Sequence, residues 1–324
     1  MVVPASRILD FSEAPIVDIA ALVDGDPKGT QAVVREIAQA CEHVGFLYVR
    51  NHRVDTTVLA ALVDQAHAFF GLPTADKMSV AVENSPQFRG YLPLEYTGNE
   101  GPEGRNLQEG FIVMQDRPLD SRAPLYGPNQ WPARLPSLKP AMLGYYAAME
   151  ALAFRMLPGM AMALGLPASS FAAPYVDPML ILKLNHYPPQ QITSDTEMIG
   201  VGGHCDGSGF TILWQDDLGG LEIKNKSGEW IGVPPIDGTF VINIGNILQR
   251  WSNGRFSSTE HRVINRYGKD RYSIAFFADP NYHTAIRPIV DQTSSDEPPF
   301  ICGEYIHKNY QRIYPQRASQ AAAD

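Results

Sequence analysis

The chain changes character at residue 179, where short runs of β-branched and aromatic residues begin to alternate with turn residues. Such apolar runs occupy residues 180–184, 210–214, 239–244 and 272–277. Turn signals separate them: Asp-Leu-Gly-Gly at 217–220, Lys-Ser-Gly at 226–228 and Ser-Asn-Gly-Arg at 252–255. Many short strands joined by tight turns predict a sandwich or a barrel, with a mouth that can hold a site.

The earlier part of the chain predicts helices mixed with a few strands. Apolar residues at helical spacing predict a helix over about 30–43, and Asp55 or Thr56 can cap a second one that ends at about Phe70. Strands are expected at 15–19 and 46–49, loops and brief strands over 80–138, and a helix near the end, over about 299–314. A long helix is predicted over about 139–164, and Pro158 should kink or interrupt it.

These patterns divide the chain into four segments of one compact unit. Residues 1–138 form a mixed α/β segment with pocket loops, and 139–177 hold the long helix and a linker. Residues 178–290 form the strand-rich core, and 291–324 form a helical segment and tail. The fold class expected is mixed α+β.

Charge and cysteine content exclude several classes of protein. The formal net charge is −9, so the basic field needed for nucleic acid or an anionic membrane surface is missing. The three cysteines are far apart and odd in number, which favours a reducing compartment over a disulfide framework. No signal peptide or membrane-spanning stretch is recognisable, so we expect a cytoplasmic protein.

Two imidazoles and one carboxylate form a candidate metal site. His204 and Asp206 are two residues apart, so an extended segment places both on one face, and a barrel can bring His261 alongside them. This ligand set is typical of non-haem Fe(II) oxygenases, with metal positions left open. Cys205 should point away from both neighbours and be a small buried residue. The other histidines are predicted not to be ligands: His43, His52, His67, His186, His283 and His307.

A candidate anion clamp lies ten residues beyond His261. Arg271 and Ser273 are again two apart on an apparent strand, so a guanidinium and a hydroxyl face one way, a geometry suited to a carboxylate. Lys183, Asn185 and Tyr187 form a second alternating polar face. From alternation alone, that face could line a cavity or meet solvent.

The residues resemble the isopenicillin N synthase-like Fe(II)/2-oxoglutarate-dependent oxygenases. The resemblance spans roughly residues 14 to 314 in the family's order. It is carried by Leu-Asn-His-Tyr-Pro-Pro at 184–189, Gly-His-Cys-Asp at 203–206, Asn-Gly-Arg-Phe at 253–256, His-Arg-Val-Ile-Asn at 261–265 and Arg-Tyr-Ser-Ile-Ala-Phe-Phe at 271–277. Pro-Ile-Val-Asp-Ile at 15–19 and Gly-Phe-Leu-Tyr-Val at 45–49 extend it into the first half.

The resemblance implies a fold, a cofactor set and a reaction. The fold is a double-stranded β-helix (jelly-roll) core with flanking helices. Fe(II) would be held by His204, Asp206 and His261. Arg271 and Ser273 would bind the far carboxylate of 2-oxoglutarate, which Tyr187 and Asn185 would help to position. O2 would then oxidise a small molecule by hydroxylation, desaturation or cyclisation, with 2-oxoglutarate converted to succinate and CO2.

Three other functions fit part of the pattern. An isopenicillin N synthase-type Fe(II) oxidase shares the ligands and the Arg-x-Ser pair but uses O2 without 2-oxoglutarate. A zinc hydrolase would need a base near the metal, and no His-Glu helical motif is present. A non-enzymatic metal-binding barrel would have no use for the clamp. We favour the 2-oxoglutarate enzyme because such members are the larger group.

The substrate is the least constrained part. Arg89, Tyr91, Arg105 and Phe111 lie where the family's variable segments approach the pocket mouth, although each could equally be an ordinary loop residue. Two arginines there would favour a carboxylate-bearing small molecule. The pattern does not indicate the oligomeric state.

Overall fold

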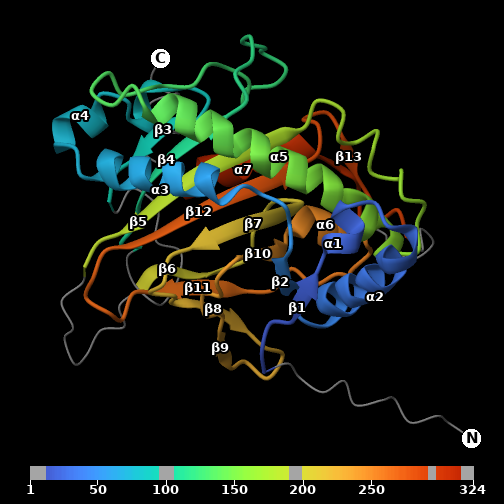
Figure 1. Cartoon of the computed structure of the whole chain (residues 1–324). Helices are drawn as coiled ribbons and strands as arrows, with labels where there is room; N and C mark the ends of the chain where they lie inside the picture. Colours follow the sequence, from blue (N-terminus) through green and yellow to red (C-terminus); the bar gives the residue numbers. More distant parts are fainter. Residues whose placement is uncertain (1–11, 95–105, 190–198, 291–296, 315–324) are drawn as a thin grey trace, which may run out of the picture.

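Two facing β-sheets form the centre of the molecule, with helices outside the larger one (Figure 1). The structure is a computed structural model, and it describes residues 12–94, 106–189, 199–290 and 297–314. The larger sheet has the strand order β1-β2-β10-β7-β12-β5-β4-β3, and the smaller one has the order β6-β11-β8-β9. This is the expected mixed α+β architecture with a jelly-roll core.

Nearly all neighbouring strands in these sheets are antiparallel; only β1 pairs with β2 in parallel. The strands of the larger sheet are β1 (Ile16–Asp18), β2 (Phe46–Arg50), β3 (Gly90–Leu92), β4 (Glu109–Met114), β5 (Met179–Tyr187), β7 (Phe210–Gln215), β10 (Thr239–Ile244) and β12 (Arg271–Asp279). Those of the smaller sheet are β6 (Ile199–His204), β8 (Leu221–Lys224), β9 (Trp230–Gly232) and β11 (His261–Ile264). Four strands from the first half of the chain thus complete the sheet of the strand-rich core.

The two faces of the larger sheet have different partners. Phe46, Tyr48, Val241 and Tyr187 pack against strands of the smaller sheet in a compact cluster between the sheets. The opposite face packs against the helices in the main hydrophobic core. Because directly paired residues of antiparallel strands share a face, the register decides which side chains face the space between the sheets.

Helices cover the outer face of the larger sheet. Figure 1 shows α3 (Thr56–Phe70) and α5 (Leu138–Ala163) across it, and α2 (Pro27–His43) also packs on α5. The other short elements are α1 (Ala20–Val23), α4 (Thr74–Met78), η1 (Val82–Asn84), α6 (Asn246–Trp251), β13 (Ala285–Ile286), β14 (Phe300–Ile301) and α7 (Cys302–Ile313). Within the described ranges, no helix combines the length and the apolar character needed to cross a bilayer.

Two helix predictions need adjustment. α2 begins at Pro27, earlier than expected, because the carboxylate of Asp26 accepts hydrogen bonds from the amides of Lys28 and Gly29 and caps the helix. α5 is not interrupted at Pro158 and continues to Ala163. Thirteen residues of α5 are buried, and this packing outweighs the hydrogen bond that proline cannot make.

Candidate functional site

Three predicted ligands converge at the edge of the smaller sheet. His204 ends β6 and His261 begins β11, and the two residues are paired in register. Oδ1 of Asp206 lies 3.6 Å from Nε2 of His204 and 3.7 Å from Nε2 of His261. In the described part of the chain, this is the one group of three such residues whose ligand atoms lie within 4.8 Å of one another.

The second ring nitrogen of each histidine, Nδ1, already has a hydrogen-bond partner in the protein. Nδ1 of His204 lies 2.9 Å from the carbonyl oxygen of Gly202, and Nδ1 of His261 lies 3.2 Å from that of Thr259. A carbonyl can only accept, so each Nδ1 carries the proton and each Nε2 presents a lone pair.

The carboxylate of Asp206 is fixed in the same manner. Its Oδ2 accepts hydrogen bonds from the hydroxyl of Thr211 at 2.6 Å and from the amide of Asn243 at 2.7 Å. Oδ1 is therefore the oxygen directed at the two imidazoles. Two neutral nitrogens and one anionic oxygen, each oriented by a second bond, fit a divalent transition metal such as Fe(II).

The surroundings keep the ligand atoms of His261 and Asp206 unprotonated. Burial and the neighbouring His204 lower the pKa of His261 to about 4. Burial raises the pKa of Asp206, but the two histidines and the Thr211 hydroxyl lower it more, so it stays below the usual range. Burial lowers the pKa of His204, while its contact with Asp206 raises it above the ordinary value. Metal must therefore compete with a proton mainly at His204.

The predicted clamp faces the same interior space. Arg271 is only 1% exposed, its Nε donates to the carbonyl of Gly219 and its Nη2 donates to Oε1 of Gln215 at 3.1 Å. Nη1 is buried without a hydrogen-bond partner in the described structure. The guanidinium lies 4.6 Å from the centre of the Tyr187 ring. A buried cationic nitrogen with no acceptor is a place for an anion.

The backbone conformation at Gly219 and Gly220 allows the Gly219 carbonyl to accept the hydrogen bond from Arg271. Both residues have positive φ angles, 70° and 87°. A Cβ on Gly220 would lie 2.3 Å from the carbonyl oxygen of Ile264, so the turn that presents the Gly219 carbonyl to Arg271 requires glycine.

The polar face of β5 lines the interior, which resolves the alternative that the sequence left open. Ser273 pairs with Asn185 in register, and Nδ2 of Asn185 lies 3.3 Å from Oγ of Ser273. Gln108 donates to Oδ1 of Asn185. Asn185 and Tyr187 are buried beside the clamp.

Three of the four residues proposed to approach the substrate are core residues. Tyr91 and Phe111 pair with each other, and Phe111 pairs with Leu184 on the helix side of the sheet. Both rings contact Phe69 of α3, with centroids 5.9 Å and 4.6 Å away. The prediction was wrong for this pair because strand alternation directs both side chains away from the interior.

Arg89 has a structural role. Its side chain is 1% exposed and donates to the carbonyls of Leu125 and Gln115 and to Oδ1 of Asn129, so it is tied to loops. The prediction that it meets substrate is therefore wrong. Arg105 lies outside the described residues.

Two other predictions had different outcomes. His186 lies on the helix side of the larger sheet. Its Nδ1 is 2.7 Å from Oε1 of Glu109 and its Nε2 is 2.8 Å from Oδ1 of Asp270, so both ring nitrogens already have protein partners. Cys205 makes its contact with the Ser258 carbonyl, but it is exposed and not buried as predicted. It follows the last residue of β6, where the sheet no longer covers it.

Sequence reasoning missed the residues that hold the ligands in place. Thr211, Gln215 and Asn243 face the interior from β7 and β10 and bond Asp206 or Arg271. A signal was present, since Thr211 and Asn243 are polar residues inside otherwise apolar strands. Such residues in a buried strand need a hydrogen-bond partner.

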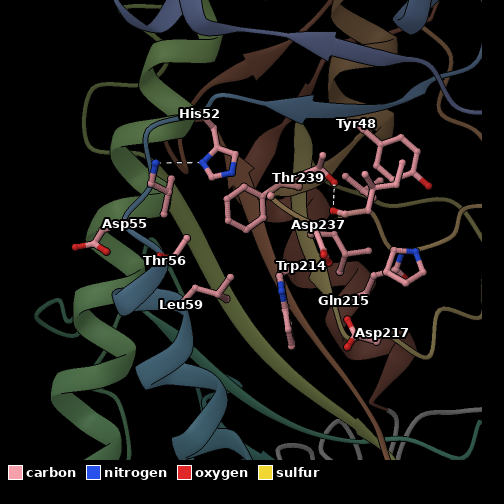
Figure 2. A pocket seen from close by; sticks show the side chains of 17 residues that line it. Tyr48, His52, Asp55, Thr56, Leu59, Trp214, Gln215, Asp217, Asp237 and Thr239 are labelled. Carbon is pink, nitrogen blue, oxygen red and sulfur yellow. Dashed lines mark hydrogen bonds between the residues drawn. The ribbon is translucent and has the colours of Figure 1, made fainter.

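A separate pocket lies beside β2, β7 and β10 of the larger sheet and the start of α3 (Figure 2). Its walls include Tyr48, His52, Leu59, Trp214 and Gln215, and none of the three metal-ligand candidates lines it. Gln215 is shared with the clamp, because the same side chain accepts from Arg271. The pocket is therefore a neighbour of the candidate site and not the space over the ligands.

Comparison with known proteins gives matches over most of the chain. Residues 178–280 match the model of the 2OG-Fe(II) oxygenase superfamily. Residues 14–134 match the model described as the non-haem dioxygenase in morphine synthesis N-terminal.

Relatives and solved structures agree with these matches. A homoarginine-6-hydroxylase of Glycine max is 36% identical over 86% of this chain and 89% of its own length. A 2-oxoglutarate-Fe(II) type oxidoreductase of Emericella nidulans is 30% identical, covering 93% and 90%. A full-length Neurospora crassa protein in complex with alpha-KG has a TM-score of 0.80 at 26% identity, covering 91% and 95%. JOX2 in complex with 2OG, Fe and JA has a TM-score of 0.77 at 27% identity, covering 95% and 88%.

Proposed function

Because the chain belongs to the 2OG-Fe(II) oxygenase superfamily, we propose specific residues for each part of its activity. The protein is an Fe(II)- and 2-oxoglutarate-dependent dioxygenase that oxidises a small molecule with O2. In our proposal His204, Asp206 and His261 hold the iron. Arg271 and Ser273 bind the far carboxylate of 2-oxoglutarate, with Tyr187 and Asn185 beside it.

One observation carries this assignment. The two Nε2 atoms and Oδ1 of Asp206 point at one another, while the other polar atom of each ligand is bonded to the protein. Bound iron with 2-oxoglutarate supplies the activation of O2 and the oxidation of a C–H bond, with release of succinate and CO2. The residues of the chain hold the metal, orient the cosubstrate and exclude water.

The unpartnered Nη1 of Arg271 supports the cosubstrate assignment. A carboxylate at this place would satisfy a donor that is otherwise buried without an acceptor. Tyr187 forms one wall through its ring, and Asn185 holds the hydroxyl of Ser273. The oxidase alternative is not favoured, because the relatives and solved structures are 2-oxoglutarate enzymes.

We propose that the substrate carries an acidic group. The arginine pair no longer supports this idea, since Arg89 is structural; the support comes from Lys183, as argued below. The similar proteins differ in substrate or ligand. One relative is named as a homoarginine-6-hydroxylase, one solved structure holds thymine and another holds JA. That the protein acts in the cytoplasm stays a prediction.

Anaerobic spectroscopy tests the assignment. The Fe(II)-loaded protein should develop a weak visible charge-transfer band when 2-oxoglutarate is added, because the cosubstrate chelates the metal. Arg271→Ala should weaken cosubstrate binding with iron still bound. Arg266→Ala is a matched control, since Arg266 is largely exposed and pairs with Glu222 outside the site. No band in the wild type despite bound iron would overturn the cosubstrate assignment.

A further inference from the structure

Lys183 lies on the face of β5 that lines the interior of the fold. It pairs with Ala275 on β12 and with Ile112 on β4, and it is two residues from Asn185 on the same face. Lys183 is therefore on the same side of the sheet as Arg271 and Ser273. Along β5 it lies two residues beyond Asn185, on the side away from Arg271.

The charge of Lys183 is close enough to influence the metal ligands. The carboxylate of Asp206 raises the pKa of Lys183, and the lysine charge lowers that of His204. Burial has the larger effect and lowers the pKa of Lys183 to about 8, so the side chain is mainly an ammonium at neutral pH. Its end passes Gly110, where an added Cβ would lie 3.1 Å from Cε of Lys183. The missing side chain at position 110 gives the lysine its room.

Lys183 has no hydrogen bond or ion pair with any residue in the described part of the chain. The contrast with Lys77, a buried lysine of the helix side, is direct. Lys77 donates to Oε2 of Glu109 at 2.7 Å and to the carbonyl of Phe70 at 3.1 Å. Unlike Lys77, Lys183 is only partly buried, so its ammonium can be reached from the interior space and has no described protein acceptor to displace before it binds an anion.

Neither Asp206 nor the cosubstrate supplies a permanent partner. If Asp206 binds the metal, its charge is engaged by a divalent cation and no longer offsets the lysine. The far carboxylate of 2-oxoglutarate is assigned to Arg271 and its other end to the metal. This step rests on the proposed function. The anion that remains to be supplied is one on the molecule that is oxidised.

We propose that the ammonium of Lys183 binds a carboxylate of the primary substrate and so orients that substrate against the metal centre. The chemistry required is an anion with oxygen acceptors, placed on the wall formed by β4 and β5. A lysine is suited to this as a compact point charge with three donors, and it does not require a planar partner. The interaction makes Lys183 a determinant of specificity and leaves the oxidation itself to the metal.

Matched acid and amide probes test this proposal. The probes are benzoate with benzamide, phenylacetate with phenylacetamide, and hexanoate with hexanamide. Each is titrated into the anaerobic Fe(II)–2-oxoglutarate complex, and the shift of the visible band reports binding near the metal. In the wild type we expect each acid that binds to do so at least roughly tenfold more tightly than its amide, as expected for a charged hydrogen bond. Lys183→Met should abolish this preference, and Lys183→Arg should retain part of it.

Two controls separate the possible sources of the effect. Lys269→Met removes one positive charge at an exposed position near β12 and should leave the acid preference unchanged. The affinity for 2-oxoglutarate itself should be unchanged in Lys183→Met. If it falls as far as in Arg271→Ala, Lys183 belongs to the cosubstrate site and the proposal is overturned.

The remaining outcomes are equally decisive. Acids and amides that bind alike, an acid preference that survives in Lys183→Met, or no shift with any acid although the 2-oxoglutarate band forms would each overturn the proposal. Absence of the 2-oxoglutarate band from the wild type would overturn the proposed function instead. Lys183→Met should also be at least as thermally stable as the wild type without ligands, because it removes a partly buried charge that no described residue pairs with.

Discussion

The side-chain amide of Asn243 donates a 2.7 Å hydrogen bond to Oδ2 of Asp206, the oxygen that does not face the two histidines. Thr211 donates to the same oxygen from the neighbouring strand. Two strands of the larger sheet thus fix a carboxylate that follows a strand of the smaller sheet. The metal site therefore depends on residues of both sheets, and the His-Cys-Asp sequence alone does not form it.

We expect Asn243→Ala to weaken metal binding by about 10- to 100-fold, because Asp206 loses a bond that orients it. Anaerobic titration with Fe(II) measures the affinity, and thermal unfolding checks that the fold is kept. Thr211→Ser is the matched control, since it retains the hydroxyl that donates to Oδ2 and should bind metal nearly as well. Equal metal affinity in Asn243→Ala and the wild type would contradict the role assigned to Asn243.

Gln215→Leu should raise the KM for 2-oxoglutarate several-fold and leave metal affinity unchanged. Gln215 accepts from Nη2 of Arg271 and donates to the Val233 carbonyl, so it holds the guanidinium in place without being close to the ligands. Steady-state kinetics with varied 2-oxoglutarate and a separate metal titration make the distinction. Gln65→Leu, a change on the surface of α3, serves as the control. A parallel loss of metal affinity would show that the substitution disturbs the barrel generally.

Arg89→Met should destabilise the fold by about 2–4 kcal/mol, because three acceptors, one of them on the buried Leu125, lose a charged donor. Those acceptors are the carbonyls of Leu125 and Gln115 and the side chain of Asn129. Urea unfolding measures the difference in the free energy of unfolding. Kinetic constants for 2-oxoglutarate should stay the same in the folded fraction. A variant with unchanged stability but weakened substrate binding would restore the original hypothesis that Arg89 contacts substrate.

The sequence was most informative where spacing within one strand carries the information. His204 with Asp206 and Arg271 with Ser273 are each two residues apart, so a shared face follows from an extended backbone alone, although Asp206 lies just beyond the end of β6. The residue pattern alone predicted a sandwich or barrel that could bring His261 alongside the other two ligands, and the resemblance added the jelly-roll topology. The supporting residues Thr211, Gln215 and Asn243 could not be assigned because the pairing of β7 with β10 and β12 is non-local.

The failures at Tyr91 and Phe111 have a related cause. Their place in the sequence is near the segments that approach the pocket in the family, but a shift of one residue in a strand reverses the face that a side chain occupies. Tyr91 and Phe111 are on the helix side for this reason. Their neighbours Gly110 and Ile112 are the residues that face Lys183 and the interior.

Asp279 should make the stability of the protein depend on pH. Oδ1 of this buried residue accepts from the amide of Gly209 at 2.8 Å. Burial is the main cause that raises its pKa to about 7, and the charge of Asp206 contributes. The folded state therefore holds a proton that the unfolded state releases at a pH of about 4. Between these two values the unfolded state binds fewer protons, so this contribution to stability is present at low pH and is lost as pH rises towards about 7.

Asp279→Asn should remove this dependence, since its amide oxygen can still accept from Gly209 and does not ionise. Compared with the wild type, the variant should gain up to about 1.4 kcal/mol in the free energy of unfolding per pH unit within that window. Urea unfolding of the metal-free protein over a pH series measures the difference, and Asp237→Asn on an exposed turn is the control. Parallel pH profiles for Asp279→Asn and the wild type would mean that Asp279 is ionised in the folded protein across the whole window. In that case the barrel would have to accommodate a second buried negative charge near Asp206.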